Sequence, residues 1–156
     1  MKLKVGAHQY PNLKPIKLPE KLSPEAPYKL LVTGTRNGRS DVEKWLDAWL
    51  RKHGRPHTLI VGEAKGVDTQ ARKWAEKNFV SLRVFYAFWR VDGIFNKKAG
   101  PERNQRMVDV CKPGDFCLAF PDETSKGTYD CVHRAKAKGL TTIVCRNLFP
   151  RIIESE

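Results

Sequence analysis

Short apolar segments alternate with longer amphipathic segments from Lys29 to Cys145, and this alternation constrains the fold more than any other feature of the sequence. Runs of four to six apolar residues are typical of buried strands, whereas apolar residues three and four positions apart indicate helices. Strands that alternate with helices favour parallel pairing, because each crossover is covered by its helix. The sequence therefore predicts an α/β domain, an open, doubly wound, mostly parallel five-stranded sheet with helices on both faces. We expect strands at residues 29–32, 58–61, 82–86, 115–120 and 140–145.

Capping residues and glycines set the expected bounds of the helices. Ser40 and Asp41 are predicted to cap a first helix that ends at Gly54, and a second helix is expected over residues 67–78. Pro101 is predicted to occupy the first position of the third helix, where proline is preorganised. The fourth helix is expected over residues 128–138, and residues 87–98 are expected to be irregular.

The two ends of the chain differ from the region between them. Residues 1–27 hold five of the ten prolines and five lysines, which predicts an extended N-terminal arm that wraps the domain, reaches a partner or is a flexible lead-in. The α/β domain is expected over residues 28–147, with a C-terminal tail at 148–156. Trp45, Trp49 and the apolar segment Leu148-Phe149-Pro150 are candidates for a homo-oligomer contact, although packing in the core explains them equally well.

Composition limits the compartment and the chemistry. No apolar run approaches the roughly 20 residues that span a membrane, and no apolar stretch follows the basic start at Met1, so the sequence predicts a cytoplasmic protein without a membrane partner. The four cysteines lack the paired spacing of zinc sites, which favours structural thiols and predicts neither a metal nor a cofactor. The net charge of +12 would attract nucleic acid, an acidic protein or a polyanionic small ligand, and does not choose among them.

Four loops lead from the carboxyl ends of predicted strands into helices, where ligands bind in sheets of this kind. Glycine lets backbone N–H groups approach an anion, helix N-termini add partial positive charge, and arginine can contact phosphate through two hydrogen bonds. Neither the P-loop nor the dinucleotide fingerprint occurs. The predicted ligand-binding residues are Gly34, Thr35 and Arg36; Gly62, Ala64, Lys65, Gly66 and Asp68; Trp89, Gly100, Arg103 and Asn104; and Ser125, Gly127 and Thr128.

Three of these residues have a second interpretation. Asp68 would hold a ribose hydroxyl or cap its helix, which aspartate often does. Asn104 would read a base edge or hold the neighbouring loop in place. Trp89 would stack on a base or pack over the edge of the sheet.

The loops, taken in order, resemble a known family. The segments Gly62-x-Ala64-Lys65-Gly66-Val67-Asp68, Ala99-Gly100-Pro101-x-Arg103-Asn104-x-x-Met107 and Ser125-x-Gly127-Thr128, with Trp89 between the first two, are similar to the YspA/YpsA-related group of the SLOG superfamily. The resemblance implies a Rossmann-like sheet with a pocket for nucleotides or nucleotide-derived ligands such as ADP-ribose, in a protein of phage or bacterial origin. Relatives in the superfamily include cytokinin-activating phosphoribohydrolases, the single-strand-DNA protein DprA and sensor domains of antiviral defence.

The sequence departs from the phosphoribohydrolases in one respect. Their motif P-G-G-x-G-T-x-x-E supplies a catalytic glutamate, whereas here Cys131 stands at the position of that glutamate. The leading prediction is therefore a ligand-binding protein or sensor. The second is a hydrolase of an N-glycosidic or phosphate bond that uses Glu123, Asp130 or Asp68 as acid or base. The third is DprA-like nucleic-acid binding, for which the sequence shows no basic strand set interleaved with aromatic residues.

Overall fold

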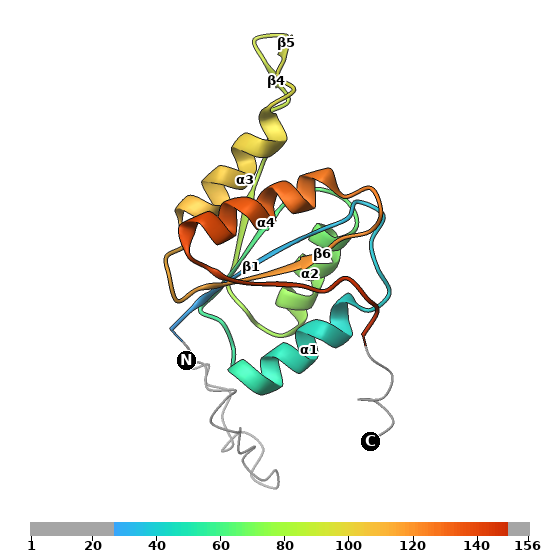
Figure 1. The fold of residues 1–156 in the computed structure, drawn as a ribbon, viewed down its shortest axis with the longest axis vertical. Coiled ribbons are helices and arrows are strands. Elements are labelled where there is room, and N and C mark those ends of the chain that lie inside the picture. Colours follow the sequence, from blue (N-terminus) through green and yellow to red (C-terminus); the bar gives the residue numbers. More distant parts are fainter. Residues whose placement is uncertain (1–26, 150–156) are drawn as a thin grey trace, which may run out of the picture.

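The computed structural model describes residues 27–149 and contains a five-stranded parallel sheet (Figure 1). The predicted N-terminal arm, Pro27 apart, and the tail beyond Phe149 lie outside the described residues. The strands of the sheet follow the spatial order β3-β2-β1-β6-β7. In chain order the elements are β1 (Lys29–Gly34), α1 (Val42–His53), β2 (Thr58–Gly62), α2 (Val67–Lys77), β3 (Leu82–Phe85), β4 (Arg90–Val91), β5 (Ile94–Phe95), α3 (Ala99–Asp109), β6 (Phe116–Phe120), α4 (Lys126–Lys138) and β7 (Thr141–Val144).

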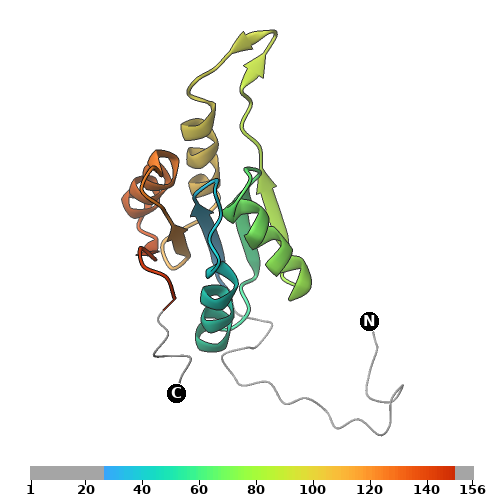
Figure 2. The same ribbon diagram turned by 90° about the vertical axis from the view of Figure 1, so that its right-hand side faces the viewer.

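Side chains alternate between the two faces of the sheet, and each face is covered by a pair of helices (Figure 2). Leu30 and Val32 of β1 belong to a core shared with α1 and α2, where Trp74 is 1% exposed. Leu31, between them in sequence, belongs to a second core that includes Met107 of α3. The predicted Rossmann-like sheet, with helices on both faces, is therefore confirmed.

The order of the strands creates a crevice in the middle of the sheet. The chain begins at the central strand β1, moves outward through β2 to β3, and returns to place β6 on the other side of β1. Helices that leave β1 and β6 consequently pack on opposite faces, so the loops after these two strands lead toward opposite faces of the sheet. Ligands bind at such a reversal, beyond the carboxyl ends of the strands.

Residues 87–98, expected to be irregular, contain a short antiparallel hairpin formed by β4 and β5. Asp92 and Gly93 connect the two strands, with φ of 54° and 77°. Positive φ at both central residues is the requirement of a type I′ turn, and Asp-Gly is a preferred sequence for it. The hairpin projects from the body of the domain between β3 and α3 (Figures 1 and 2).

Three predictions at helix N-termini differ from the structure, one of them the start of the fourth helix, which was expected at Thr128 and lies at Lys126. Asp41 occupies the N-cap position of α1 but its side chain does not cap, because it accepts hydrogen bonds from Arg39, Trp45 and the backbone of Phe149. The third helix begins at Ala99, so Pro101 lies within its first turn rather than at its first position. Proline is tolerated there because the first-turn N–H groups have no partner inside the helix.

The cysteines and tryptophans fit a structural role. Cys111, Cys117, Cys131 and Cys145 are all buried and unpaired, and burial raises the pKa of Cys145 to about 12, so the thiol stays protonated. Trp45, half-buried, packs edge-on against Phe149 at 5.2 Å between ring centroids. Among residues 27–149, no helix has the length and hydrophobicity required to cross a bilayer.

Candidate functional site

A cavity of about 1260 Å³ lies beyond the carboxyl ends of β1 and β6. Its walls come from the loop after β1, the loop after β6 and the first turns of α2, α3 and α4. Twelve of the fifteen predicted ligand-binding residues line it: Gly34, Thr35, Arg36, Ala64, Asp68, Trp89, Gly100, Arg103, Asn104, Ser125, Gly127 and Thr128. The four predicted loops therefore meet at one rim of the sheet.

Three predicted residues, Gly62, Lys65 and Gly66, do not line the cavity. Lys65 is exposed. A side chain at Gly62 would overlap Arg103 and come within 2.7 Å of Asp68 Oδ2. The absence of a side chain at Gly62 therefore leaves the space that Arg103 and Asp68 occupy. Gly66 has a φ of 77° and lies against the backbone of Thr35 and Arg36, which joins the loop after β2 to the loop after β1. Both glycines support the wall of the cavity from behind.

Asp122 fixes one side of the cavity. Its Oδ2 accepts hydrogen bonds from Thr35 Oγ1 at 2.6 Å and Asn37 Nδ2 at 2.8 Å, which ties the loop after β6 to the loop after β1. Its Oδ1 accepts hydrogen bonds from the backbone N–H of Thr124 and the hydroxyl of Ser125. These donors, Thr35 first, hold the pKa of Asp122 well below its usual range.

The N-terminus of α4 opens onto the cavity without a side-chain cap. Ser125 is at the N-cap position, where serine ordinarily accepts a hydrogen bond from the first turn, but its side chain makes no such bond. Its hydroxyl instead donates to Asp122 Oδ1 and accepts from the Asp122 backbone N–H, both at 2.8 Å. Gly127 and Thr128 follow in the first turn and line the cavity. This arrangement leaves the positive end of the helix directed at the space between the loops.

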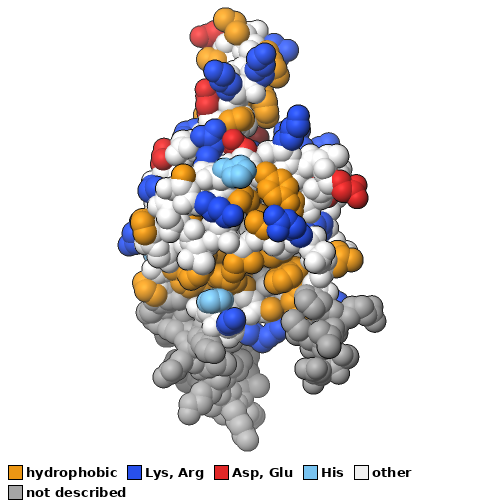
Figure 3. All heavy atoms as spheres, viewed as in Figure 1, with side chains coloured by type: hydrophobic (Ala, Val, Ile, Leu, Met, Phe, Trp, Pro, Cys, Tyr) orange, Lys and Arg blue, Asp and Glu red, His pale blue; other side chains and the backbone are white. Residues whose placement is uncertain are grey.

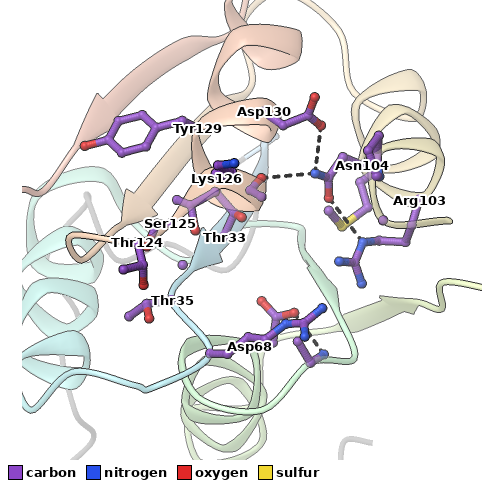
Figure 4. A pocket seen from close by; sticks show the side chains of 18 of the residues that line it. Thr33, Thr35, Asp68, Arg103, Asn104, Thr124, Ser125, Lys126, Tyr129 and Asp130 are labelled. Carbon is purple, nitrogen blue, oxygen red and sulfur yellow. Dashed lines mark hydrogen bonds between the residues drawn. The ribbon is translucent and has the colours of Figure 1, made fainter. Parts of the chain in front are cut away.

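The first turns of α3 and α4 are linked on the opposite side (Figure 4). Asn104 Nδ2 donates to the carbonyl oxygen of Gly127 at 3.2 Å and to Asp130 Oδ2 at 3.0 Å. Asn104 Oδ1 accepts a hydrogen bond from Arg103 Nε at 3.1 Å, and Arg103 Nη1 forms an ion pair with Glu63 at 2.7 Å. These contacts support the second interpretation of Asn104, in which its side chain holds the neighbouring loop in place.

Asp68 is 5% exposed and lies at the floor of the cavity. The capping interpretation is wrong, because Gly66 occupies the N-cap position of α2 and Asp68 Oδ2 accepts its hydrogen bond from the Ala64 backbone N–H at 3.0 Å. Burial raises the pKa of Asp68 to about 6, against the lowering effects of that hydrogen bond and of the Arg103 guanidinium. A carboxyl group with this pKa exchanges a proton near neutral pH.

All three candidate catalytic carboxylates line the same cavity, in different environments. Glu123 is exposed. Burial alone would raise the pKa of Asp130, but hydrogen bonds from Arg134 and Asn104 outweigh it and hold the pKa below its usual range. Asp68 is the one of the three whose raised pKa suits proton transfer.

Sequence reasoning missed several residues of this region: Thr33, Asn37, Pro101, Met107, Thr124, Lys126, Tyr129 and His133 line the cavity, Glu63 pairs with Arg103, and Asp122 joins two loops. Trp89, one of the expected residues, lines the cavity and stacks with Phe95 at 6.0 Å between ring centroids. The Asp92-Gly93 pair between apolar residues was the signal for the hairpin that carries both aromatic rings.

Among residues 27–149, no cluster of three or more histidine, cysteine, aspartate or glutamate residues has the geometry to hold a metal ion.

Comparison with known proteins identifies the family. The sequence model of the YspA, cpYpsA-related SLOG family matches residues 28–91. The chain is also 34% identical over 122 residues to the Gene 61 protein of Mycobacterium phage D29, an alignment that covers 74% of this chain and 94% of the phage protein. The chain belongs to this SLOG family.

The family match and the cavity overlap only in part. The matched residues run from Tyr28 to β4, so they include the loops after β1 and β2 and the residues Asp68 and Trp89. The first turns of α3 and α4, which supply Asn104 and Thr128, lie beyond the match. In this SLOG chain the second half of the domain therefore completes a cavity that begins in the matched half.

Proposed function

We propose that the chain binds a nucleotide or nucleotide-derived ligand that carries phosphate, in the cavity beyond β1 and β6. The observation that carries the proposal is the convergence of three helix N-termini, those of α2, α3 and α4, on this one cavity. None of the three has a side-chain hydrogen bond from its N-cap residue. Backbone N–H groups at helix N-termini, together with the helix dipole, favour bound phosphate.

The side chains divide the cavity into two regions with different chemistry. Lys126 and the uncapped first turn of α4 offer a positive charge and the positive end of the helix (Figure 4). The Thr35 and Ser125 hydroxyls already donate to Asp122, so they fix the wall of this region. Asp68 and Asp130 lie away from them, and a carboxylate there would repel phosphate but accept hydrogen bonds from ribose hydroxyls. The proposed orientation therefore places phosphate at α4 and the sugar near Asp68.

The volume of the cavity fits this class of ligand. Small-molecule sites commonly measure about 300–1000 Å³, so a cavity of about 1260 Å³ has room for a nucleotide with an additional group. Dinucleotides and ADP-ribose are ligands of this size. Membership of a SLOG family supports a nucleotide-related ligand at the same place.

Isothermal titration calorimetry with AMP, ADP, ADP-ribose and cyclic dinucleotides tests the proposal. At least one compound should give saturable binding with one site per chain, and Arg103→Ala should weaken it at least about tenfold because the arginine lines the cavity. Arg51→Ala removes an exposed arginine from the last turn of α1 and should leave binding unchanged. Absence of binding by every compound would refute the proposal.

Asp68 favours a second candidate function, hydrolysis of an N-glycosidic or phosphate bond in the bound nucleotide. Its pKa of about 6 and its place on the floor of the cavity suit a general acid or base. Chromatographic detection of a released base or phosphate, lost in Asp68→Asn and retained in Glu123→Gln, would support this activity. Stable nucleotides after prolonged incubation with the wild-type chain would leave binding as the function.

A further inference from the structure

The hairpin arm, which we define as residues 86–98, exposes several large apolar side chains beside the cavity. Phe88 is 59% exposed, Ile94 71% and Phe95 55%. Two strands of two residues each cannot bury a core of their own, so these side chains remain more than half exposed. Because the arm projects away from the sheet (Figures 1 and 2), stability of the domain does not explain its aromatic content.

Arginine side chains lie over the aromatic rings of the arm. The Arg106 guanidinium is 5.0 Å from the ring centroid of Phe88, that of Arg90 is 5.6 Å from Phe95, and that of Arg36 is 6.0 Å from Trp89. The hairpin arm contains three basic residues, Arg90, Lys97 and Lys98, against a single acidic one, Asp92. Figure 3 shows the Lys and Arg side chains around the projecting arm.

The hairpin interleaves aromatic rings with cations, contrary to the expectation that no such basic strand set occurs, and this alternation decides which partner fits. Protein-docking surfaces are enriched in aromatic residues and arginine but depleted of lysine, and their core separates from a polar rim. On the hairpin arm the rings of Phe88, Trp89 and Phe95 are each accompanied by a guanidinium, and the exposed Lys97 and Lys98 follow directly in sequence. Single-stranded nucleic acid presents the complementary alternation, since its unpaired bases stack on aromatic rings and its phosphates pair with Lys and Arg.

We propose that the hairpin arm is a binding surface for single-stranded nucleic acid. Phe88 and Phe95 provide stacking surfaces for bases, and Arg90, Lys97 and Lys98 contact phosphates. Trp89 stacks on Phe95 with an interplanar angle of 14° and also lines the cavity, so a strand on the arm leads directly to the cavity mouth. Binding of a strand by the arm does not require a nucleotide in the cavity. The affinity of the arm for the strand is measured separately from the affinity of the cavity for a nucleotide.

Fluorescence anisotropy with a labelled 20-nucleotide poly(dT) strand tests the proposal with the full chain. Phe88→Ala/Phe95→Ala should raise the dissociation constant at least about tenfold, because base–aromatic stacking contributes substantially per base. Phe79→Ala is the matched control: Phe79 is 85% exposed but follows α2, at the opposite rim of the sheet, and its loss should change the dissociation constant less than twofold. Lys97→Ala/Lys98→Ala should reduce the dependence of affinity on salt, whereas Lys73→Ala on α2 should not.

A duplex of the same length should bind more weakly than the single strand and should not respond to loss of the two phenylalanines. If the single strand binds equally well to wild type and Phe88→Ala/Phe95→Ala, the attraction comes from the net charge of +12 and the proposal is wrong. If oligonucleotides do not bind and the double substitution converts a dimer to a monomer in sedimentation velocity, the arm joins copies of this chain and the proposal is likewise wrong.

Discussion

Asn104 on α3 and Asp130 on α4 are joined by a hydrogen bond of 3.0 Å between Nδ2 and Oδ2. The same amide nitrogen donates to the carbonyl oxygen of Gly127, so one buried side chain holds both the first turn of α4 and a carboxylate that faces the cavity. The relationship sets the distance between two helix N-termini. It makes the cavity a preformed site rather than one that a ligand must assemble.

Asn104→Ala should destabilise the domain and weaken nucleotide binding together. Loss of hydrogen bonds to two partners in a buried region predicts a decrease in the free energy of unfolding on the order of 1–3 kcal/mol, measured by urea denaturation. Lys136→Ala, at an exposed position of α4, should stay within about 0.5 kcal/mol of wild type. Equal stability of the two variants would mean that Asn104 does not fix the wall of the cavity.

Asp68→Asn should change how stability depends on pH. The folded-state pKa of Asp68, about 6, is above the unfolded value of 3.8, so the folded state binds the proton more tightly. Stability contributed by this group is therefore present below pH 4 and is lost as pH rises to about 6, a change of about 2–3 kcal/mol by linkage. Urea denaturation of both proteins between pH 4 and 7 should show the variant gaining stability relative to wild type as pH rises. A constant difference would contradict the raised pKa.

Gly66→Ala should destabilise the domain by about 1–3 kcal/mol. Alanine would be strained at a φ of 77°, and its methyl group would overlap the backbone of Thr35 and Arg36. Gly127→Ala serves as the control, since Gly127 has space for a methyl group and lies within α4, where alanine is the better helix former. Thermal unfolding should show a lower midpoint for the first variant and an equal or higher one for the second. The reverse order would refute the described junction between the loops after β1 and β2.

Asp122→Ala should weaken nucleotide binding about tenfold or more, because the loops after β1 and β6 lose their common acceptor. Because the pKa of Asp122 is lowered, its carboxylate stays ionised and holds the two loops together at pH values above the unfolded pKa. This contribution to binding is lost only in strong acid. Titration of Asp122 should therefore not change the calorimetric affinity of the wild-type chain between pH 5 and 8. Lys136→Ala, at an exposed position of α4 that does not line the cavity, should bind as wild type does; equal affinity of both variants would exclude a role for Asp122.

The regular elements could be predicted from the sequence because each depends on local pattern. Leu30, Leu31 and Val32 form a continuous apolar run, as expected of a strand covered on both faces. The gathering of Gly34, Asp68, Arg103 and Thr128 at one rim followed from parallel connectivity alone, since all carboxyl ends of parallel strands lie at the same edge.

The contacts that shape the cavity could not be predicted in the same way. Thr35 and Asp122 are 87 positions apart in sequence, and they meet only because β6 pairs with β1 rather than with β3. Local pattern does not specify that order. Asp41 is a typical helix-capping residue by sequence. In the structure its carboxylate instead accepts hydrogen bonds from the nearby guanidinium of Arg39. Asp92-Gly93 was a local signal of a hairpin, and it was missed because each strand is only two residues long.

The amide resonances of the glycines provide the most direct measurement, because a single ¹H–¹⁵N spectrum contains both the site and its controls. Gly34, Gly100 and Gly127 line the cavity, whereas Gly54, Gly114 and Gly139 precede strands and therefore lie at the opposite rim. During titration with a nucleotide, we predict that the first three shift with one common dissociation constant and that the other three do not move. Shifts confined to Gly54, Gly114 and Gly139, or no shifts with any nucleotide at millimolar concentration, would contradict the account.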